Sequence, residues 1–493
     1  MRTRNKSEEY LKKGDAKYGC SDYKGAILDY TKAIEINPTF AKVYYLRGNA
    51  KVELSDYGGA IEDYNHAIEI NDNDAEVFNN RGIAKANLTD NYAAIQDFNK
   101  AIEINPAFAD AYIGRGLAKY NLSDYSGAIQ DCNRAIEINP NDAEAYRNRG
   151  TVKDGLSDYK GAVKDYTKAI EINPNDAEAY YNRGDVKTKL SDYRGALQDC
   201  NKAIEISPND AVAYNNRGNV KTELSDFRGA IQDYTKAIEI NANDAEAYYN
   251  RGIAKANLTD FSGAIQDFNK AIEINPNFAK AYHNRGNVKT KLSDYGGAIQ
   301  DFNHAIKVNP YDAVAYYNRG NVKTELLDYR GAIQDFTKAI EIHPHFAEAY
   351  NNCGNAKTKL ADYNGAILDY SNAIKINPKD AETYNNRGNA KTKISDYSGA
   401  IRDYDNALEI HPNDVKVYSN RGMAKGNLKD YSGAIQDYSK VIEMNPKFAL
   451  AYVERGIAKY FFGDKTGACL DWKKAGKFGY SKADELINEY CDE

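Results

Sequence analysis

The residue types that most often carry catalysis or metal binding are sparse in this chain and are not spaced for either. There are six histidines, and none belongs to an H-E-x-x-H or comparable ligand pattern. His343 and His345 flank a proline, and we interpret them as a chance pair in a loop. No G-x-G-x-x-G, Walker or nucleophile-elbow motif occurs. We therefore expect no enzyme activity, no metal and no other cofactor. The histidines are His66, His283, His304, His343, His345 and His411.

The six cysteines also lack the spacing of a redox or zinc motif. None forms a C-x-x-C pair, and two of them occupy places where aromatic residues otherwise recur. We interpret the cysteines as small buried hydrophobic residues in a reducing compartment, in preference to a disulfide or zinc framework. They are Cys20, Cys132, Cys200, Cys353, Cys469 and Cys491.

The polar residues that do recur follow a period of 34 residues. Ala143-Glu-Ala-Tyr146 returns as Ala177-Glu-Ala-Tyr180 and as Ala245-Glu-Ala-Tyr248. Fourteen repeats, the first starting at residue 7 and the last at residue 449, cover residues 7–482 without an insertion. We expect an N-terminal tail at 1–6, and a C-terminal capping helix with an acidic tail at 483–493. Positions are numbered 1 to 34 within each repeat below.

Each repeat contains the pattern of two helices. Small or apolar residues at positions 4, 8, 10 and 14 indicate the first helix, and alanine at position 20, an aromatic at position 24 and alanine at position 27 indicate the second. A Ser/Thr-Asp pair such as Ser191-Asp192 is predicted to cap the second helix. Asn173-Pro174 is predicted to end it, because the residue before proline avoids helical geometry. The fold class is therefore all-α.

Glycine stands at position 8 in all fourteen repeats, inside the first helix. A glycine there costs about 1 kcal/mol relative to alanine. The recurrence indicates that a side chain would block contact between the helices. We expect the glycine at position 8 and the alanine at position 20 to let the two helices cross closely, with the aromatic residues at positions 4 and 24 packed beside them.

This combination of an aromatic at position 4, glycine at 8, alanine at 20, an aromatic at 24, alanine at 27 and proline at 32 resembles the tetratricopeptide repeat. The resemblance covers nearly the whole chain. It implies antiparallel helix pairs stacked into a right-handed superhelical solenoid, with the first helices lining a concave groove. It also implies a scaffold that binds peptides and other proteins.

The chain departs from the family pattern at three charged positions. Position 7 is Arg in twelve repeats, position 11 is Lys in all fourteen, and position 23 is Asp in all fourteen. We infer that these charges pair across the two helices of each repeat, in preference to an anion-binding ladder. In one repeat Cys353 replaces the arginine, so Asp369 must rely on Lys357 or water.

Asparagine recurs on the face that should line the groove. Position 6 is Asn in ten repeats and position 9 in six, and the two lie one helical turn apart. An amide offers a donor and an acceptor to the backbone of an extended peptide, although recent duplication of the repeats explains the regularity equally well. We call these two sets the asparagine columns. The predicted groove residues are Asn216, Asn219, Asn284, Asn287, Asn318, Asn321, Asn352, Asn355, Asn386 and Asn389.

The partner is predicted to be another protein. The carboxylate clamp of chaperone-binding family members is incomplete here, because position 5 is never Lys and position 6 is never Arg. The net charge of −6 gives no basic surface for nucleic acid, and no apolar run is long enough for a membrane span. We expect a cytoplasmic, non-enzymatic scaffold that binds an extended segment. The alternatives are a self-assembling structural role and the targeting arm of a separate enzyme or chaperone complex.

Overall fold

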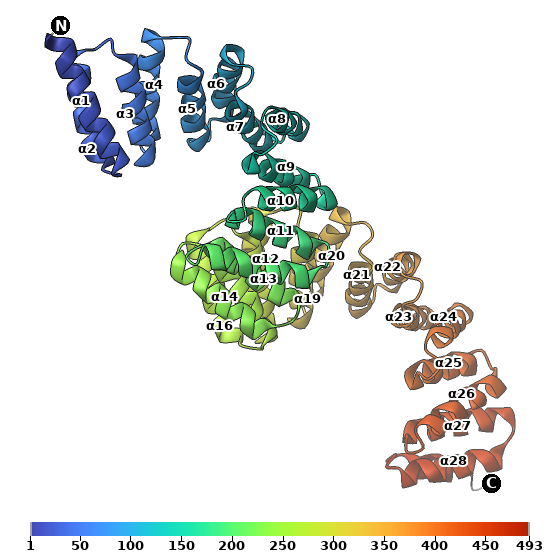
Figure 1. The fold of residues 1–493 in the computed structure, drawn as a ribbon. Coiled ribbons are helices and arrows are strands. Elements are labelled where there is room, and N and C mark those ends of the chain that lie inside the picture. Colours follow the sequence, from blue (N-terminus) through green and yellow to red (C-terminus); the bar gives the residue numbers. More distant parts are fainter. Residues whose placement is uncertain (1, 492–493) are drawn as a thin grey trace. The chain divides into compact units, whose positions relative to one another are not determined.

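The computed structural model describes residues 2–491, with side chains from Lys6 onward, and it is helical throughout (Figure 1). Over these residues there are 29 helices and no strand, so the all-α prediction is confirmed. The helices fall into two compact units, one ending at Leu258 and the other starting at Thr259. Each unit is described by itself.

The first unit comprises helices α1 to α15. They are α1 (Arg2–Gly19), α2 (Tyr23–Ile36), α3 (Ala41–Glu53), α4 (Tyr57–Ile70), α5 (Ala75–Asn87), α6 (Asn91–Ile104), α7 (Ala109–Asn121), α8 (Tyr125–Ile138), α9 (Ala143–Gly155), α10 (Tyr159–Ile172), α11 (Ala177–Lys189), α12 (Tyr193–Ile206), α13 (Ala211–Glu223), α14 (Phe227–Ile240) and α15 (Ala245–Asn257). Helix α1 begins at Arg2, so residues 2–6, expected to form a tail, continue into the first helix.

The second unit comprises helices α16 to α29. They are α16 (Phe261–Ile274), α17 (Ala279–Lys291), α18 (Tyr295–Val308), α19 (Ala313–Glu325), α20 (Tyr329–Ile342), α21 (Ala347–Lys359), α22 (Tyr363–Ile376), α23 (Ala381–Lys393), α24 (Tyr397–Ile410), α25 (Val415–Asn427), α26 (Tyr431–Met444), α27 (Ala449–Phe462), α28 (Lys465–Lys477) and α29 (Ala483–Tyr490). Residues 492–493 of the expected acidic tail lie outside the described residues.

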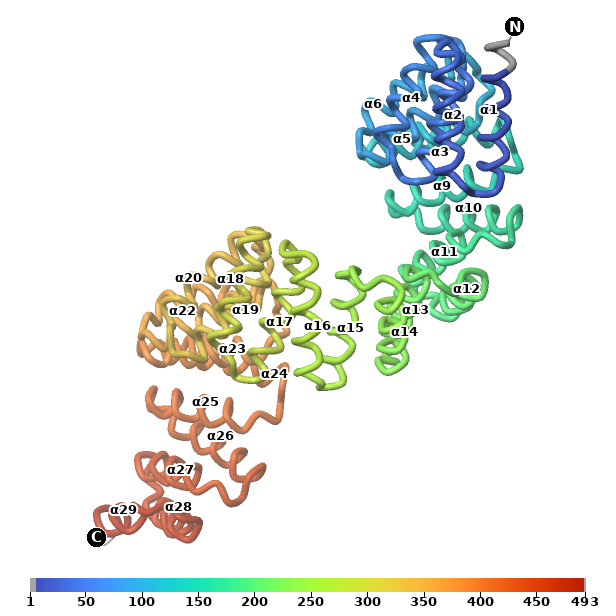
Figure 2. The backbone as a smooth tube through the Cα atoms, turned by 90° about the vertical axis from the view of Figure 1, so that its left-hand side faces the viewer, coloured from blue at the N-terminus to red at the C-terminus, as the bar shows by residue number. Residues whose placement is uncertain are grey.

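The helices pair as hairpins, and the hairpins stack in chain order. Odd-numbered helices up to α27 are the first helices of the repeats, and even-numbered ones are the second helices. Figure 2 follows this stacking from α17 to α23 in the second unit. The first helices of successive repeats also contact one another: α17 contacts α19, and α19 contacts α21. Among the described residues, no two second helices of successive repeats lie as close together. The first helices therefore lie on the more closely packed, inner side of each stack.

The turn between the two helices of a repeat is built by one aspartate and one left-handed residue. Asp192 accepts a hydrogen bond at 3.0 Å from the backbone nitrogen of Gly195 and so caps α12. Ser191 does not cap. Its φ of 62° is left-handed, and the same conformation is adopted at position 15 by Leu327 and Lys429, which have no capping group. The prediction that both residues of the Ser/Thr-Asp pair cap the helix was wrong for the first of them.

Close helix crossing accounts for the glycine at position 8. In α19 a Cβ added at Gly320 would lie 2.7 Å from the ring of Phe336, which is fully buried at position 24. Ala332 and Ala339, on the same face of α20, are also fully buried. The ring thus occupies the space that a side chain at position 8 would need, which confirms the predicted packing.

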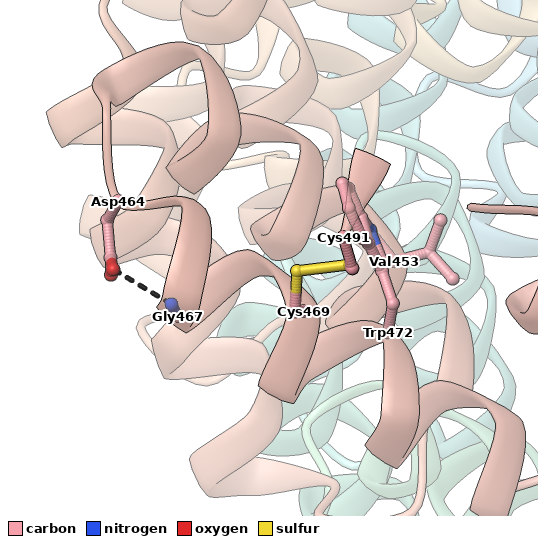
Figure 3. Close-up of a disulfide and its surroundings, with 6 residues drawn as sticks. All are labelled: Val453, Asp464, Gly467, Cys469, Trp472 and Cys491. Carbon is pink, nitrogen blue, oxygen red and sulfur yellow. Dashed lines mark hydrogen bonds between the residues drawn. A yellow bond between two sulfur atoms is a disulfide. The ribbon is translucent and has the colours of Figure 1, made fainter. Parts of the chain in front are cut away.

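The cysteines divide into three environments, and one pair corrects the sequence-based interpretation. Cys132, Cys200 and Cys353 are buried and free, as expected, whereas Cys20 is free but exposed, so the expectation of a buried residue was wrong there. Cys469 and Cys491 form a disulfide (Figure 3), whereas we expected no disulfide. The reason is tertiary, since α29 folds back against the preceding repeat.

The contacts of α29 show how the stack ends. Tyr490 packs against Tyr460 and Trp472, with ring centroids 5.0 and 5.8 Å apart. Trp472 is 1% exposed, and its indole nitrogen donates to the carbonyl oxygen of Val453 at 3.3 Å (Figure 3). The final repeat therefore buries its aromatic core under α29 instead of under a further hairpin.

None of the helices described here is both long enough and apolar enough to span a membrane.

Candidate functional site

Within each unit, the repeats that carry arginine at position 7 form an ion-pair network from the recurring charges, as the sequence predicts. In repeat 12, Arg387 on α23 donates from Nε and Nη2 to both carboxylate oxygens of Asp403 on α24, at 2.9 and 2.6 Å. Lys391 lies 2.7 Å from the same carboxylate, which is 2% exposed. Equivalent pairs extend from Arg47–Asp63 to Arg455–Asp471. A bidentate arginine and a lysine together compensate the buried carboxylate, so the network is structural.

The arginine also joins each repeat to the one before it, which the sequence analysis missed. Arg387 Nη1 donates at 3.0 Å to the hydroxyl of Ser371, at position 25 of the preceding repeat. Its guanidinium lies over the ring of Tyr384 at 5.6 Å. The signal was present, because position 25 is Thr, Asn, Ser or Asp in the first thirteen repeats. It becomes Lys473 in the last repeat, after which no arginine follows.

The asparagine columns hydrogen bond to each other between repeats. Asn352 donates from Nδ2 to Asn321 Oδ1 at 2.9 Å and to the Tyr317 hydroxyl at 3.1 Å. Asn318 contacts Asn287 at 3.0 Å in the same way. The position-6 amide thus reaches back to positions 9 and 5 of the preceding repeat, and the columns stabilise the stacking.

Position 9 also satisfies buried tyrosine hydroxyls at position 24. Tyr370 donates to Asn355 at 2.8 Å, and Tyr404 donates to Asn389 at 2.9 Å. Burial raises the pKa of Tyr370 to about 12, which keeps the hydroxyl protonated as a donor. Asparagine at position 9 is therefore a structural acceptor as well as a residue of the inner side.

The remaining predicted residues divide between the two compact units. In the first unit, Asn219 accepts from Asn250 at 3.2 Å, and Asn216 has no hydrogen bond to any described residue. In the second unit, Asn386 donates to Asn355 at 3.3 Å, and Asn284 lies on α17, its first complete hairpin. The structure thus connects Asn219 and Asn386 to neighbouring repeats, whereas Asn216 is not connected in this way to any described residue.

The columns retain hydrogen-bonding capacity toward solvent. In Asn318, Asn352 and Asn386 the amide nitrogen is engaged, and no described residue donates to Oδ1. In Asn321 and Asn355 the oxygen is engaged, and Nδ2 donates to no described residue. All five side chains are half-buried. Each pair therefore offers one acceptor and one donor on the inner side, the pair of groups that an extended backbone requires.

Other chemistry has no comparable basis in the described residues. They contain no group of three or more histidine, cysteine, aspartate or glutamate side chains placed to hold a metal ion. The histidine on the inner side, His283, contacts Asn318 at 3.2 Å and faces Asp312 at 3.5 Å. The hydrogen bond with His283 lowers the pKa of Asp312. These contacts place His283 within the inter-repeat network.

Models of known families match most of the chain. The model described as tetratricopeptide repeat matches residues 109–142, 177–210, 245–278, 279–312, 313–346, 381–414 and 415–448. A model described as TPR repeat matches residues 14–55, 48–88, 156–191, 218–258 and 354–395, and a further tetratricopeptide repeat model matches 75–108. Among functionally curated proteins, no match was found.

Several solved structures resemble the chain. The structure of the APC/C hetero-tetramer Cut9-Hcn1 is 14% identical, with 92% of this chain and 96% of that chain covered and a TM-score of 0.43. A tetratricopeptide repeat protein from Parabacteroides merdae is 20% identical over 51% of this chain and 99% of its own, with a TM-score of 0.45. YrrB, described as a TPR protein with an unusual peptide-binding site, is 27% identical over 37% of this chain and 95% of its own, with a TM-score of 0.31.

The family models cover well over half of the sequence, and the helical hairpins follow the same 34-residue register. The chain belongs to the tetratricopeptide repeat family.

Proposed function

We propose that this chain binds an extended segment of a partner protein along the inner side of its first helices. Tandem tetratricopeptide repeats form protein-interaction scaffolds and are typically non-enzymatic. The finer statement, that the asparagine columns hold the backbone of the segment, is the proposal. It concerns the second unit above all, where repeats 9 to 12 carry asparagine at both positions.

The observation that supports this proposal is that each of the five half-buried asparagine amides described above has one group, either its oxygen or its nitrogen, that bonds to no described residue. Asn318 and Asn352 hold their nitrogens against the preceding repeat, which fixes the orientation of the amide. Their oxygens remain available on the inner side. A side chain held in one orientation loses little further conformational entropy when a ligand binds. The columns are in this sense preorganised for an extended backbone.

The test is a double substitution measured against a selected peptide. A peptide that binds the full chain would be selected from a random 16-residue library, and its affinity would be measured by isothermal titration calorimetry. Asn318→Ala with Asn352→Ala removes two free acceptors, together with the amide nitrogens that bond to the preceding repeats. At about 1 kcal/mol per hydrogen bond, we expect an approximately thirtyfold weaker Kd. The fold should persist, because alanine regains helix propensity of about 0.5 kcal/mol at each position.

The control replaces two exposed amides on the outer helices. Gln334→Ala with Asn364→Ala removes amides from α20 and α22, and neither amide bonds to a described residue. This variant should bind the peptide as the parent does. Equal affinity of the inner and outer double variants would remove the asparagine columns from the mechanism. Light scattering on the same samples tests the self-assembling alternative, because peptide binding by a monomer argues against it.

A further inference from the structure

Near the C-terminal end of the second unit, the inner side contains a pocket whose lining differs from that of the repeats before it. It has a volume of about 230 Å³ and lies between α25, α26 and α27. Its lining includes Gly426 and Met423 from α25, Tyr431 and Tyr438 from α26, and Glu454 from α27. The position-9 asparagines have ended at this point of the chain, and the last position-6 asparagine is Asn420 on α25.

Two substitutions in repeat 13 change the lining of the pocket. Position 12 is Thr in six earlier repeats, and here it is Gly426. A Cβ added at Gly426 would meet no atom within 4 Å, so the threonine volume is left empty. Position 9, an asparagine in repeats 9 to 12, is Met423, which is 43% exposed.

The same substitutions leave a tyrosine hydroxyl without a partner at position 9. Seven tyrosines occupy position 24, and in six of them the hydroxyl bonds to a side chain at position 9. Tyr438 is the seventh. It is 3% exposed, lines the pocket, and makes no hydrogen bond with any described residue. Because Tyr438 lines the pocket, its hydroxyl is available to a polar group that binds there.

A carboxylate lies in the same pocket without a compensating cation. Glu454 stands at position 6, where the regular repeats carry asparagine. It forms no ion pair with a described residue. Burial raises the pKa of Glu454, as expected for a carboxylate withdrawn from water without a counterion. A bound cation would relieve this cost.

Aromatic rings form the outer wall. Phe461 of α27 and Tyr431 of α26 are stacked, with centroids 5.6 Å apart and planes at 19°, and both line the pocket. Phe461 is nevertheless 61% exposed. Aromatic faces beside a carboxylate attract an alkylammonium group. The ring quadrupole and the negative carboxylate both attract the ammonium, and the apolar ring surface packs against the alkyl stem.

We propose that the pocket between repeats 13 and 14 binds a lysine side chain of the partner segment, with its ammonium between the Glu454 carboxylate and the Tyr438 hydroxyl. The stem of the lysine would pack against Met423 and the stacked rings. This proposal rests on the proposed function, to which it adds a chemical identity for one partner residue. It also predicts that free lysine derivatives bind to the pocket, and this binding should not depend on the asparagine columns.

The chain offers an internal probe for the test. It contains three methionines, and Met423 lines the pocket, whereas Met444 lies at the far end of α26. Full-length protein labelled with ¹³C at the methionine methyl groups would be titrated with Nα-acetyl-lysine N-methylamide. We expect the Met423 signal to shift with a Kd of roughly 1 mM, as for a fragment of this size, and the Met444 signal to stay in place. The matched ligand is the norleucine derivative, which has a similar stem and no charge.

Two variants separate binding from folding. Glu454→Gln should weaken lysine binding at least tenfold without loss of stability. Gly426→Thr restores the threonine of regular repeats, so it should fill the pocket and abolish the shift while the protein remains folded. Asn318→Ala with Asn352→Ala should leave the lysine shift unchanged, which distinguishes this site from the columns. The proposal fails if norleucine shifts Met423 as lysine does, if Glu454→Gln binds normally, or if the arginine derivative binds more tightly than lysine.

Discussion

The repeat that lacks its arginine provides the most quantitative test of the ion-pair network. Lys357 lies 2.7 Å from Asp369 Oδ2, but this oxygen receives no directed hydrogen bond, whereas in other repeats the arginine Nε supplies one. Asp369 and the Thr337 hydroxyl both face the thiol of Cys353. Burial raises the pKa of this thiol to about 12. Cys353→Arg should therefore place a guanidinium beside acceptors that are already in position.

The expected gain follows from the contacts of an intact repeat. Three hydrogen bonds form, two to Asp369 and one to Thr337, each worth about 1.5 kcal/mol when a charged group is involved. Fixing the arginine in one conformation costs about 2 kcal/mol of side-chain entropy. Losing the burial of the cysteine side chain costs about 1 kcal/mol more. The net gain is about 1.5 kcal/mol, which corresponds to roughly tenfold slower exchange of the protected amides.

The appropriate assay is local, because long repeat arrays do not unfold in one step. Hydrogen exchange measured by mass spectrometry would compare peptides from α21 and α22 in the parent and the variant. Arg387→Cys in the next repeat is the reverse change and should cost about 3 kcal/mol, because it leaves Asp403 with its lysine alone. Cys353→Met fills space without donating hydrogen bonds. If it slows exchange as much as Cys353→Arg does, or if Cys353→Arg slows nothing, the pairing argument is refuted.

The glycines and the disulfide allow two further tests. Gly320→Ala should lower the stability by at least about 1 kcal/mol, because the added Cβ would lie 2.7 Å from the ring of Phe336. Gly116→Ala should raise the stability by about 1 kcal/mol, because position 24 of that repeat is a cysteine and the added Cβ would lie no closer than 3.4 Å to any atom of the facing helix. Thermal denaturation of the two variants measures this, and a shift of the same sign in both would contradict it. Cys491→Ser should speed amide exchange in α29, as should reduction of the parent protein, because both remove the bond to Cys469. Exchange rates that do not change would show that aromatic packing alone holds this helix.

The limits of sequence-based prediction lie at the contacts between repeats. Pairing of positions 7, 11 and 23 within one repeat was predicted, since two helices joined by a short turn must face each other. The third bond of Arg387, to Ser371, was not predicted, because it depends on how far one hairpin is offset from the next. The asparagine columns were predicted as a surface, and their role as an inter-repeat network appeared only when the hairpins were stacked.

The sequence by itself determined the 34-residue period, the start and end of the second helix in each repeat, and the closeness of the two helices in a hairpin. These follow from local signals, namely aspartate caps, proline stops, and glycine opposite an aromatic ring, each acting within a single repeat. Only the tertiary structure decided the Cys469–Cys491 bond and the pocket that holds Tyr438 and Glu454. Both depend on side chains from different hairpins or helices meeting in space, and the geometry that brings them together is set by packing along the stack.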